Sequence, residues 1–365
     1  MTPATTYPAR RDDVRLLVID PRAGSFAETR TTALADLFSA GDLVVVNDAA
    51  TLPASLRGVD ERGRPIEIRL LSVADPDSGG ARFWAALLGA GDWRQRTEDR
   101  PAPPELGAGE RLRFGDLGAK VVGRAALSPR LLAVRFDADG DALWAALYRH
   151  ARPVQYSYLA HELPLWAVQT VYAGRPWAFE MPSAGRPLSW ETLLALRRRG
   201  VALASLTHAA GLSATGDRAL DAALPLPERY DIPGATVRAI GEARARGGRV
   251  IAVGTTVVRA LEGAAAAGRL RAGAGSTGIA GVTDLRIAPG FRLRVVDGIL
   301  SGTHAAGESH YALLSAFADR GLLERAIAVA DARGFQTHEL GDAMLVAPGT
   351  LSSGHDAGAR AALVA

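Results

Sequence analysis

The sequence predicts an α/β protein in which a mostly parallel, layered sheet is interrupted by a small β-barrel. Three observations support this fold class. Apolar, β-branched runs occur at 15–19 and 42–47, alternating strands separated by Gly, Pro and Asp turns follow from about Ile66, and helices alternate with apolar strands after residue 150. Helices that alternate with buried strands are typical of a parallel sheet covered on both faces.

The composition indicates a globular protein with more than one core. The chain has 365 residues, of which 48% are hydrophobic and 22% charged, and a single core rarely extends over such a length. Cysteine is absent, which excludes disulfides and a thiolate nucleophile. The N-terminal residues lack the apolar core of a signal peptide, and no apolar run is long enough for a membrane span, so we expect a cytoplasmic protein.

The first elements are predicted to form a β-α-β unit, because TTALADLFSAG shows helical spacing between the runs at 15–19 and 42–47. The proline-rich segment 100–109 is predicted to be a loop of the barrel, since its prolines remove hydrogen-bond donors. The barrel strands are predicted at IEIRLLSV, RFWAALLG, ERLRF, AKVVGRAAL and RLLAVRF.

After a predicted helix at 141–150, two helix-strand units follow: SWETLLALRRRG before VALASLT, and TVRAIGEARARGG before RVIAVG. DLRIA, FRLRVVDG, two helices between Ser309 and Arg333, and GDAMLV complete the fold. We therefore expect an α/β catalytic domain formed by 1–60 and 150–349, an inserted β-barrel domain at 61–149 and a poorly ordered tail at 350–365.

Two strand ends carry candidate chemistry. A strand ends at Gly254 and a helix begins at Thr255 and Thr256, where free N–H groups attract an anion, and Arg259 lies on the same face. The alternative is an ordinary threonine cap with an Arg259–Glu262 surface pair. His208 follows another strand and is the first candidate acid or base, although a lone histidine in a loop is more often only a hydrogen-bonding residue.

Polar groups also lie at the start of the chain. Asn47 and Asp48 end the second apolar run and could fix ribose hydroxyls or a base edge, or simply form a turn or helix cap. Arg11 and Asp12 precede the first strand, where the alternative is a solvated charge run continuing to Arg15.

Two further motifs are not expected to bind a cofactor. His304, Glu308 and His310 do not have the spacing of a zinc helix, so no metal is predicted. Gly273, Gly275 and Gly278 match G-x-G-x-x-G, but they follow a helix and precede a strand. We expect a mobile loop beside the site rather than a dinucleotide fingerprint.

Taken in order, these stretches resemble the S-adenosylmethionine:tRNA ribosyltransferase-isomerase family of the queuosine pathway. The resemblance runs from residue 10 to residue 346, through RRDDVRLLVID, GDLVVVNDAATLPASL, QTVYA, PSAG, RVIAVGTTVVRALE, GVTDLRIAPGFRLRVVDG, LLSAFA and GDAMLV. It implies an α/β domain with an inserted barrel. It also implies an enzyme that moves the ribosyl group of S-adenosylmethionine, a co-substrate, onto a 7-aminomethyl-7-deazaguanine in tRNA, releasing adenine and methionine.

The resemblance also implies roles for site residues. The candidate catalytic residues are His208, Glu228 and Asp48, and Gly254 to Thr256 with Arg259 are the candidate anion site. The candidate substrate-binding residues are Arg11, Asp12, Asn47, Gln169, Tyr172, Pro182, Ser183, Gly185, Gly254, Thr255, Thr256, Arg259 and His304.

Several polar residues of the family pattern are replaced. Ala49 and Ala50 follow Asp48 where the family has Thr-Arg, and Arg186 with Pro187 interrupts a segment that reads PTAGLHFT in the family. Two alternatives therefore stay open beside the tRNA-modifying enzyme: a paralogue that uses S-adenosylmethionine on a small-molecule acceptor, and a non-catalytic nucleotide- or RNA-binding protein.

Overall fold

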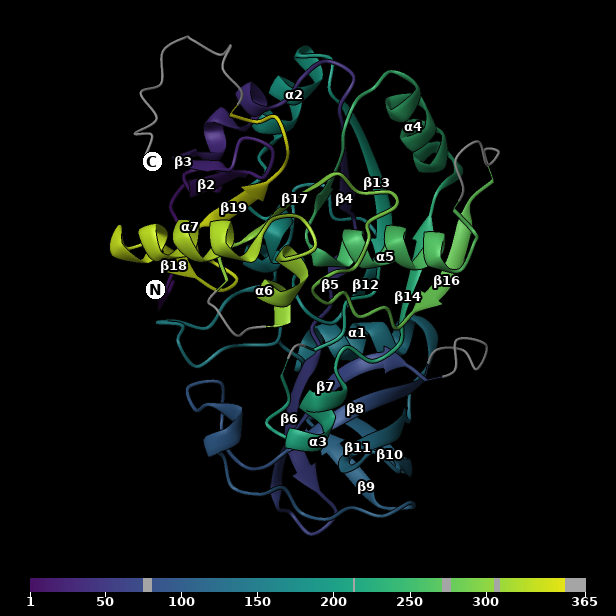
Figure 1. Cartoon of the computed structure of the whole chain (residues 1–365). Coiled ribbons are helices and arrows are strands. Elements are labelled where there is room, and N and C mark those ends of the chain that lie inside the picture. Colours follow the sequence, from purple (N-terminus) through teal and green to yellow (C-terminus); the bar gives the residue numbers. More distant parts are fainter. Residues whose placement is uncertain (75–80, 213, 271–276, 305–308, 352–365) are drawn as a thin grey trace.

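The computed structural model describes residues 1–74, 81–212, 214–270, 277–304 and 309–351. A mixed nine-stranded sheet forms the α/β part (Figure 1). Its strands follow in the order β16 (Ile279–Thr283), β14 (Glu228–Ile232), β13 (Ala202–His208), β4 (Leu43–Asn47), β15 (Val250–Val253), β17 (Gly298–Gly302), β19 (Ala343–Val346), β2 (Arg15–Asp20) and β3 (Ser25–Arg30).

The four central strands β13, β4, β15 and β17 are parallel, and antiparallel partners flank them on both sides. In β4, Leu43 and Val45 pack into the core on one face, whereas Val44 and Val46 pack into the core on the other. Strands buried on both faces are continuous apolar runs for this reason. The centre of the sheet is therefore the parallel, layered structure that the sequence predicts.

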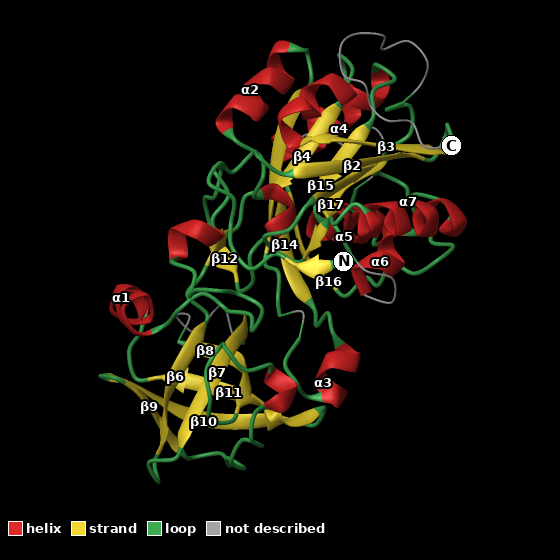
Figure 2. Cartoon of the chain, turned by 90° about the vertical axis from the view of Figure 1, so that its left-hand side faces the viewer, coloured by secondary structure: helices red, strands yellow, loops and turns green. Residues whose placement is uncertain are grey.

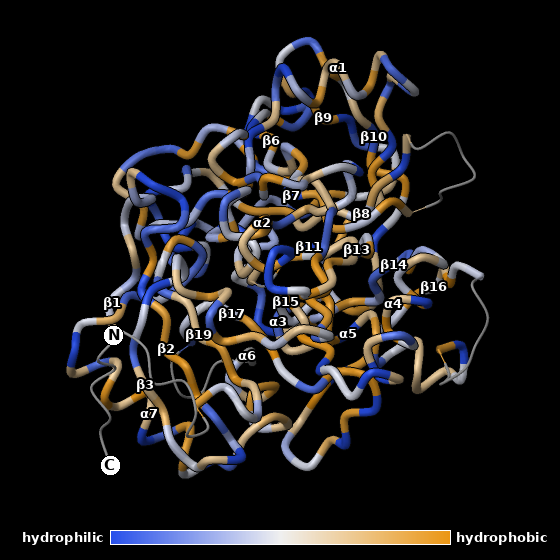
Figure 3. The backbone as a smooth tube through the Cα atoms, turned by 90° about the horizontal axis from the view of Figure 1, so that it is seen from above, coloured by the Kyte–Doolittle hydropathy of each residue, from blue (hydrophilic) through white to orange (hydrophobic). Residues whose placement is uncertain are grey.

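Helices cover both faces of the sheet (Figure 2). One core contains side chains of α4 (Gly234–Ala245), α5 (Thr255–Ala266) and α7 (Arg320–Ala332), and the opposite core contains those of α2 (Trp190–Arg198) and the 3-10 helix η1 (Thr31–Leu37). Along the tube in Figure 3 the buried strands β2 and β19 are hydrophobic.

The predicted β-α-β unit at the start of the chain is wrong. β2 forms a hairpin with β3, and η1 then leads to β4, which lies several strands away from β2 and runs in the opposite direction. Gly24, at φ +65, makes the tight turn of this hairpin, and its N–H donates to the carbonyl of Asp20. The strand SFAETR has only two strongly apolar residues, Phe26 and Ala27, so its sequence does not predict a strand.

The inserted β-structure is a closed barrel, and the five predicted strand stretches are all present in it. A sixth strand comes from SLRGVD, just before the predicted region. The segment 100–109 contains no strand, in agreement with its prolines. In order around the barrel the strands are β10 (Leu117–Ala125), β11 (Ser128–Phe136), β8 (Arg82–Leu88), β7 (Pro65–Val73), β6 (Ser55–Asp60) and β9 (Arg111–Phe114).

The predicted helix after the barrel is α1 (Gly140–His150), and both later helix-strand units are present as α2 with β13 and α4 with β15. Figures 1 and 2 show the barrel below the sheet, with the small sheet of β5 (Ala50–Thr51) and β12 (Pro176–Ala178) at the junction. No helix among the described residues is long and apolar enough to cross a membrane. The remaining elements are β1 (Thr2–Pro3), η2 (Thr97–Asp99), η3 (Leu165–Val168), η4 (Ser183–Gly185), α3 (Arg218–Ala223), α6 (Ser309–Leu314) and β18 (Gln336–Thr337).

Candidate active site

The carboxyl ends of β4, β13 and β15 meet at one edge of the sheet, where the side chain of Asn47 joins them. Its Nδ2 donates to the carbonyl of His208 at 3.0 Å and to Oγ1 of Thr256 at 3.4 Å, and its Oδ1 accepts from the N–H of His208 at 2.9 Å. The structure therefore brings these three predicted residues together. Because Asn47 is only 2% exposed and packs between the other two, it occupies the space in which a ligand was expected.

Asp48 is held at the same edge by β13. Its carboxylate accepts hydrogen bonds from Ser205 Oγ at 2.8 Å and Thr207 Oγ1 at 2.6 Å, and its N–H donates to the carbonyl of Leu206. Both carboxylate oxygens are thus engaged within the protein, which fits a positioning role for Asp48 better than a free catalytic base.

His208, Glu228 and Arg259 form a buried row. His208 has no exposed surface, and its Nε2 lies 3.3 Å from Oε2 of Glu228, which in turn lies 2.7 Å from Nη2 of Arg259. The N–H of Gly211 donates to Oε1 of Glu228 at 2.8 Å. The sequence placed His208 in a loop, but it is the last residue of β13 and pairs with Tyr230 of β14.

Burial controls the protonation of this row. Desolvation, helped by the nearby charge of Arg259, lowers the pKa of His208 to about 3, so this imidazole is neutral at physiological pH. Desolvation also raises the pKa of Glu228, although Arg259 and the Gly211 N–H favour its ionised form. A carboxyl group with opposing influences of this kind is suited to proton transfer.

A cavity of about 530 Å³ lies between the barrel and the sheet, and Glu228 is in its wall. The barrel side contributes Leu71 and Trp84, and Trp144 of α1 adds a second indole, while the sheet side contributes Trp177 and Phe179. An apolar cleft of this size between two parts of a fold, with few polar groups, is the usual form of a small-molecule site.

The cavity does not coincide with the predicted crevice. Among its described lining residues Glu228 is the candidate catalytic residue, whereas His208, Asp48 and Gly254 to Thr256 do not line it. His208 lies on the side of Glu228 away from the cavity, and its contact with Glu228 links it to the cavity wall. The predicted groups are neighbours, but they do not share one cavity. Asn47, His208 and Thr256 form a buried hydrogen-bonded network, and Glu228 lies between His208 and the cavity.

The cap alternative at the start of α5 is wrong. The N-cap is Gly254 at φ 89, ψ 156, without a side-chain cap bond, and Thr256 receives its hydrogen bond from Asn47. Arg259 pairs with Glu228 instead of Glu262, whose buried carboxylate accepts three backbone N–H groups from 294–296. The first N–H groups of α5 therefore have no capping side chain among the described residues.

Gln169 and Tyr172 make hydrogen bonds to the backbone of neighbouring segments. The amide of Gln169 exchanges two hydrogen bonds with the backbone of Thr51, at 2.9 and 2.8 Å. Tyr172 donates to the carbonyl of Gly185 at 3.4 Å, and burial raises its pKa. A Cβ on Gly185 would lie 2.0 Å from that hydroxyl, so a larger residue here would require the ring of Tyr172 to shift. Pro182 and Ser183 open η4, which packs against Gly254 through Ala184.

The N-terminal charges are not a solvated run. Asp12 is 5% exposed and accepts from Ser189 Oγ at 3.1 Å and Arg10 Nε at 3.3 Å. Arg11 is half-buried, and its Nη1 donates to the carbonyls of Gln169 at 2.7 Å and Arg186 at 3.1 Å. Neither residue lines the large cavity.

His304 follows β17, and its Nε2 lies 3.1 Å from Oγ of Ser301. Glu308 and the side chain of His310 lie outside what the structure describes, as do Gly273, Gly275 and the tail beyond Leu351. Within the described ranges no cluster of three potential metal ligands is present.

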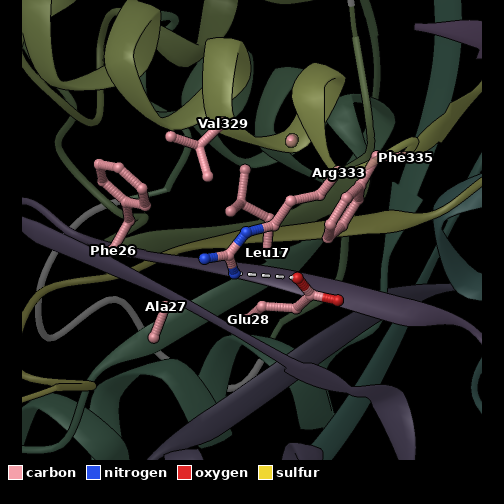
Figure 4. A pocket seen from close by; sticks show the side chains of 8 residues that line it. Leu17, Phe26, Ala27, Glu28, Val329, Arg333 and Phe335 are labelled. Atoms are coloured by element: carbon pink, nitrogen blue, oxygen red, sulfur yellow. Dashed lines mark hydrogen bonds and ion pairs between the residues drawn. The ribbon is translucent and has the colours of Figure 1, made fainter. Parts of the chain in front are cut away.

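A second hollow lies between α7 and the hairpin of β2 and β3 (Figure 4). Its volume is about 10 Å³, and a pair between Arg333 and Glu28, 3.2 Å apart, closes one side. This space holds about one water molecule, so it is not a ligand site.

Comparison with known proteins agrees with these features. The family model described as "Queuosine biosynthesis protein" matches residues 2–346. The chain belongs to this family. An S-adenosylmethionine:tRNA ribosyltransferase-isomerase from Trichlorobacter lovleyi is 33% identical over 93% of this chain and 95% of its own length. A protein of the same name from Azoarcus sp. (strain BH72) is 35% identical over 93% and 92%.

A solved structure shows the same fold for a related protein. It is the crystal structure of an S-adenosylmethionine tRNA ribosyltransferase from Thermotoga maritima, with 24% identity, coverage of 94% of this chain and 95% of that one, and a TM-score of 0.50. The α/β sheet with a closed barrel is thus a fold that this queuosine family shares.

Some residues of the site gave no clear signal in the sequence. Trp84, Trp144 and Trp177 are scattered through the chain, and only the packing of the barrel against the sheet brings them to one cavity. Arg229 lies 3.6 Å above the ring centroid of Trp177 and was also missed. Its position directly after Glu228 gave no hint, because successive side chains of a strand point to opposite faces.

Proposed function

We propose that this protein transfers and isomerises the ribosyl group of S-adenosylmethionine onto 7-aminomethyl-7-deazaguanine in tRNA, giving epoxyqueuosine with release of adenine and methionine. Relatives with this name cover over nine-tenths of the chain. The observation that carries the proposal within the molecule is Glu228, a buried acid with a raised pKa in the wall of a tryptophan-lined cavity of about 530 Å³.

The cavity suits a sulfonium nucleoside. Indole faces attract a cation and stack on a purine, and Trp84, Trp144 and Trp177 supply such faces. The apolar walls exclude water, which strengthens the interaction between Glu228 and a positive sulfonium.

Glu228 is the group we assign to proton transfer. The sulfonium acidifies the adjacent ribose C5′, so a base must accept that proton, and adenine leaves more readily once one of its nitrogens is protonated. A carboxylate that accepts the C5′ proton can return it to the departing base. Arg259, 2.7 Å away, stabilises the ionised form before the transfer.

His208, Asn47 and Asp48 are positioning residues in this proposal. Neutral His208 contacts Glu228 from the side away from the cavity, and Asn47 donates hydrogen bonds to both His208 and Thr256. The uncapped start of α5 at Gly254 to Thr256 is suited to the methionine carboxylate, and η4 packs beside it through Ala184. The same proposal places the protein in the cytoplasm. Its catalytic α/β domain comes from both sides of the insert, its barrel domain begins at β6 (Ser55–Asp60) rather than at residue 61, and 350–365 is the tail.

The decisive experiment measures adenine release from labelled S-adenosylmethionine. Three arms contain tRNA bearing 7-aminomethyl-7-deazaguanine, the same tRNA with guanine at that position, or a small primary amine. Release only in the first arm supports the proposal. Release without tRNA, or with the small amine, overturns it in favour of the paralogue, and binding without release in any arm overturns it in favour of a non-catalytic protein.

A further inference from the structure

Arg11 and Arg186 form a pair of guanidinium groups without a carboxylate partner. Arg186 is 5% exposed, and its Nε donates to the carbonyl of Ala167 at 3.2 Å, while Arg11 donates only to carbonyls. Among the described residues no Asp or Glu forms an ion pair with either side chain. Buried cations are normally paired, because an unpaired one loses hydration without compensation.

The electrostatics of this pair are unfavourable in the unliganded protein. Burial, together with the positive charge of Arg11, lowers the pKa of Arg186 to about 10. Burial also lowers the pKa of Arg11. A buried guanidinium that already loses hydration, and that the charge of Arg11 disfavours further, would gain from an anion bound beside it.

The pair retains unused donors that reach the surface. Both Nη atoms of Arg186 and the Nη2 atom of Arg11 have no acceptor within the described part of the chain, and none is among the fully buried atoms that lack a partner. Each of these N–H groups therefore keeps some accessible surface and a hydrogen that is available to an oxyanion.

An exposed aromatic pair lies directly beside the arginines. The guanidinium of Arg186 is 5.7 Å from the ring centroid of Tyr7, and Tyr7 contacts Trp166 edge to face at 5.6 Å. Trp166 is 63% exposed and Tyr7 36%, which is unusual for side chains of this size. A flat, open indole next to an anion site is the arrangement with which proteins bind single-stranded nucleic acid.

We propose that Arg11 and Arg186 bind a phosphodiester group of the RNA substrate, and that an adjacent unpaired base stacks on Trp166. This inference rests on the proposed function for the identity of the RNA. It also assigns a use to a departure from the family pattern, since Arg186 stands where the resemblance places a leucine. The site lies outside the tryptophan-lined cavity and is joined to it through Gln169 and Thr51, the residue before the cavity-lining Leu52.

The test measures binding of an unmodified tRNA transcript by fluorescence anisotropy over a range of salt concentrations, without S-adenosylmethionine. Arg186→Leu should weaken binding about tenfold and reduce the slope of log Kd against log salt by about 0.7, the loss of one phosphate contact. Arg186→Lys should retain most of the slope. Trp166→Ala should weaken binding about tenfold, and the matched control Trp190→Ala, which removes another indole that is 56% exposed, should bind as wild type.

Folding and the competing ligand are controlled separately. Arg186→Leu should melt at or above the wild-type temperature, because it removes an unpaired buried charge. If Arg186→Leu does not fold, the comparison of RNA affinity between Trp166→Ala and Trp190→Ala decides whether the inference holds. Wild-type RNA affinity and salt slope in Arg186→Leu overturn the inference. So does a loss confined to S-adenosylmethionine affinity, which would assign the pair to its carboxylate.

The two proposals fail in different ways. RNA binding that depends on Arg186, in a protein that releases no adenine with the modified tRNA, leaves the phosphate site standing and rejects the proposed reaction. Adenine release with that tRNA, in a protein whose RNA affinity is unchanged in Arg186→Leu and Trp166→Ala, supports the proposed reaction and rejects the phosphate site.

Discussion

Nη2 of Arg259 lies 2.7 Å from Oε2 of Glu228, at the wall of the cavity between the barrel and the sheet. The two residues come from α5 and β14, which are separated in the chain by α4 and β15. Their contact explains why Arg259 does not serve as a free anion site. It also gives Glu228 a cation that opposes the effect of burial on its pKa.

Replacing Glu228 by glutamine should abolish most adenine release. The amide keeps the size and the hydrogen bond from Gly211 but cannot transfer a proton, so we expect kcat to fall at least about 100-fold, together with a smaller loss of S-adenosylmethionine affinity because the charge opposite the sulfonium is removed. The matched control is Glu242→Gln on the exposed surface of α4. A Glu228→Gln enzyme with a near-normal rate would exclude the assigned proton transfer.

The buried imidazole of His208 should make the protein labile to acid. Its folded pKa of about 3 lies below the unfolded value of about 6.5, so the folded state binds this proton more weakly. The resulting stability is fully present above pH 6.5 and is lost as the pH falls towards 3, with a slope of roughly 1.4 kcal/mol per pH unit.

Urea unfolding at pH 7, 6 and 5 measures this effect. The free energy of unfolding should fall less steeply in His208→Gln than in wild type, whereas the exposed control His161→Gln should keep the wild-type slope. Identical slopes in all three proteins would mean that His208 is not buried in its neutral form.

Trp177→Ala should weaken binding of S-adenosylmethionine. The indole of Trp177 lines the cavity, and Arg229 packs against its ring. Removing the indole therefore takes away aromatic surface from the cavity wall. Isothermal titration calorimetry should show a loss of about tenfold, while the exposed Trp190→Ala keeps the wild-type Kd. An unchanged affinity in Trp177→Ala would place the nucleoside elsewhere.

Gly254→Ala should be more destabilising than Gly24→Ala. Gly254 adopts φ 89 and ψ 156, a region open essentially to glycine alone, and its added Cβ would lie 3.4 Å from Ala184. Gly24 has φ +65 in open space, where alanine is strained but not crowded. We expect a cost of about 2–3 kcal/mol at Gly254 and about 1 kcal/mol at Gly24, measured by urea unfolding. Equal costs would show that the turn relaxes.

Local pattern was sufficient for much of the fold. In β9, Leu112 and Phe114 are buried while Arg111 and Arg113 are exposed, and this alternation identifies a barrel strand without any partner. β14 was missed although its burial also alternates, because Glu228 and Asp231 make ERYDI look like a loop. Its strand conformation depends on pairing with β13 and β16.

The chain alone determined five of the barrel strands, the later helix-strand units and the residue types that meet at the strand ends, because periodicity and turn residues act over a few positions. Only the tertiary structure decided that Asn47 fills the expected crevice, that His208 is neutral behind Glu228, and that three tryptophans share a cavity with that acid. These outcomes depend on desolvation and on contacts between segments that are separated in the sequence, by 161 residues for Asn47 and His208. No local pattern encodes which side chain is removed from water when such segments pack.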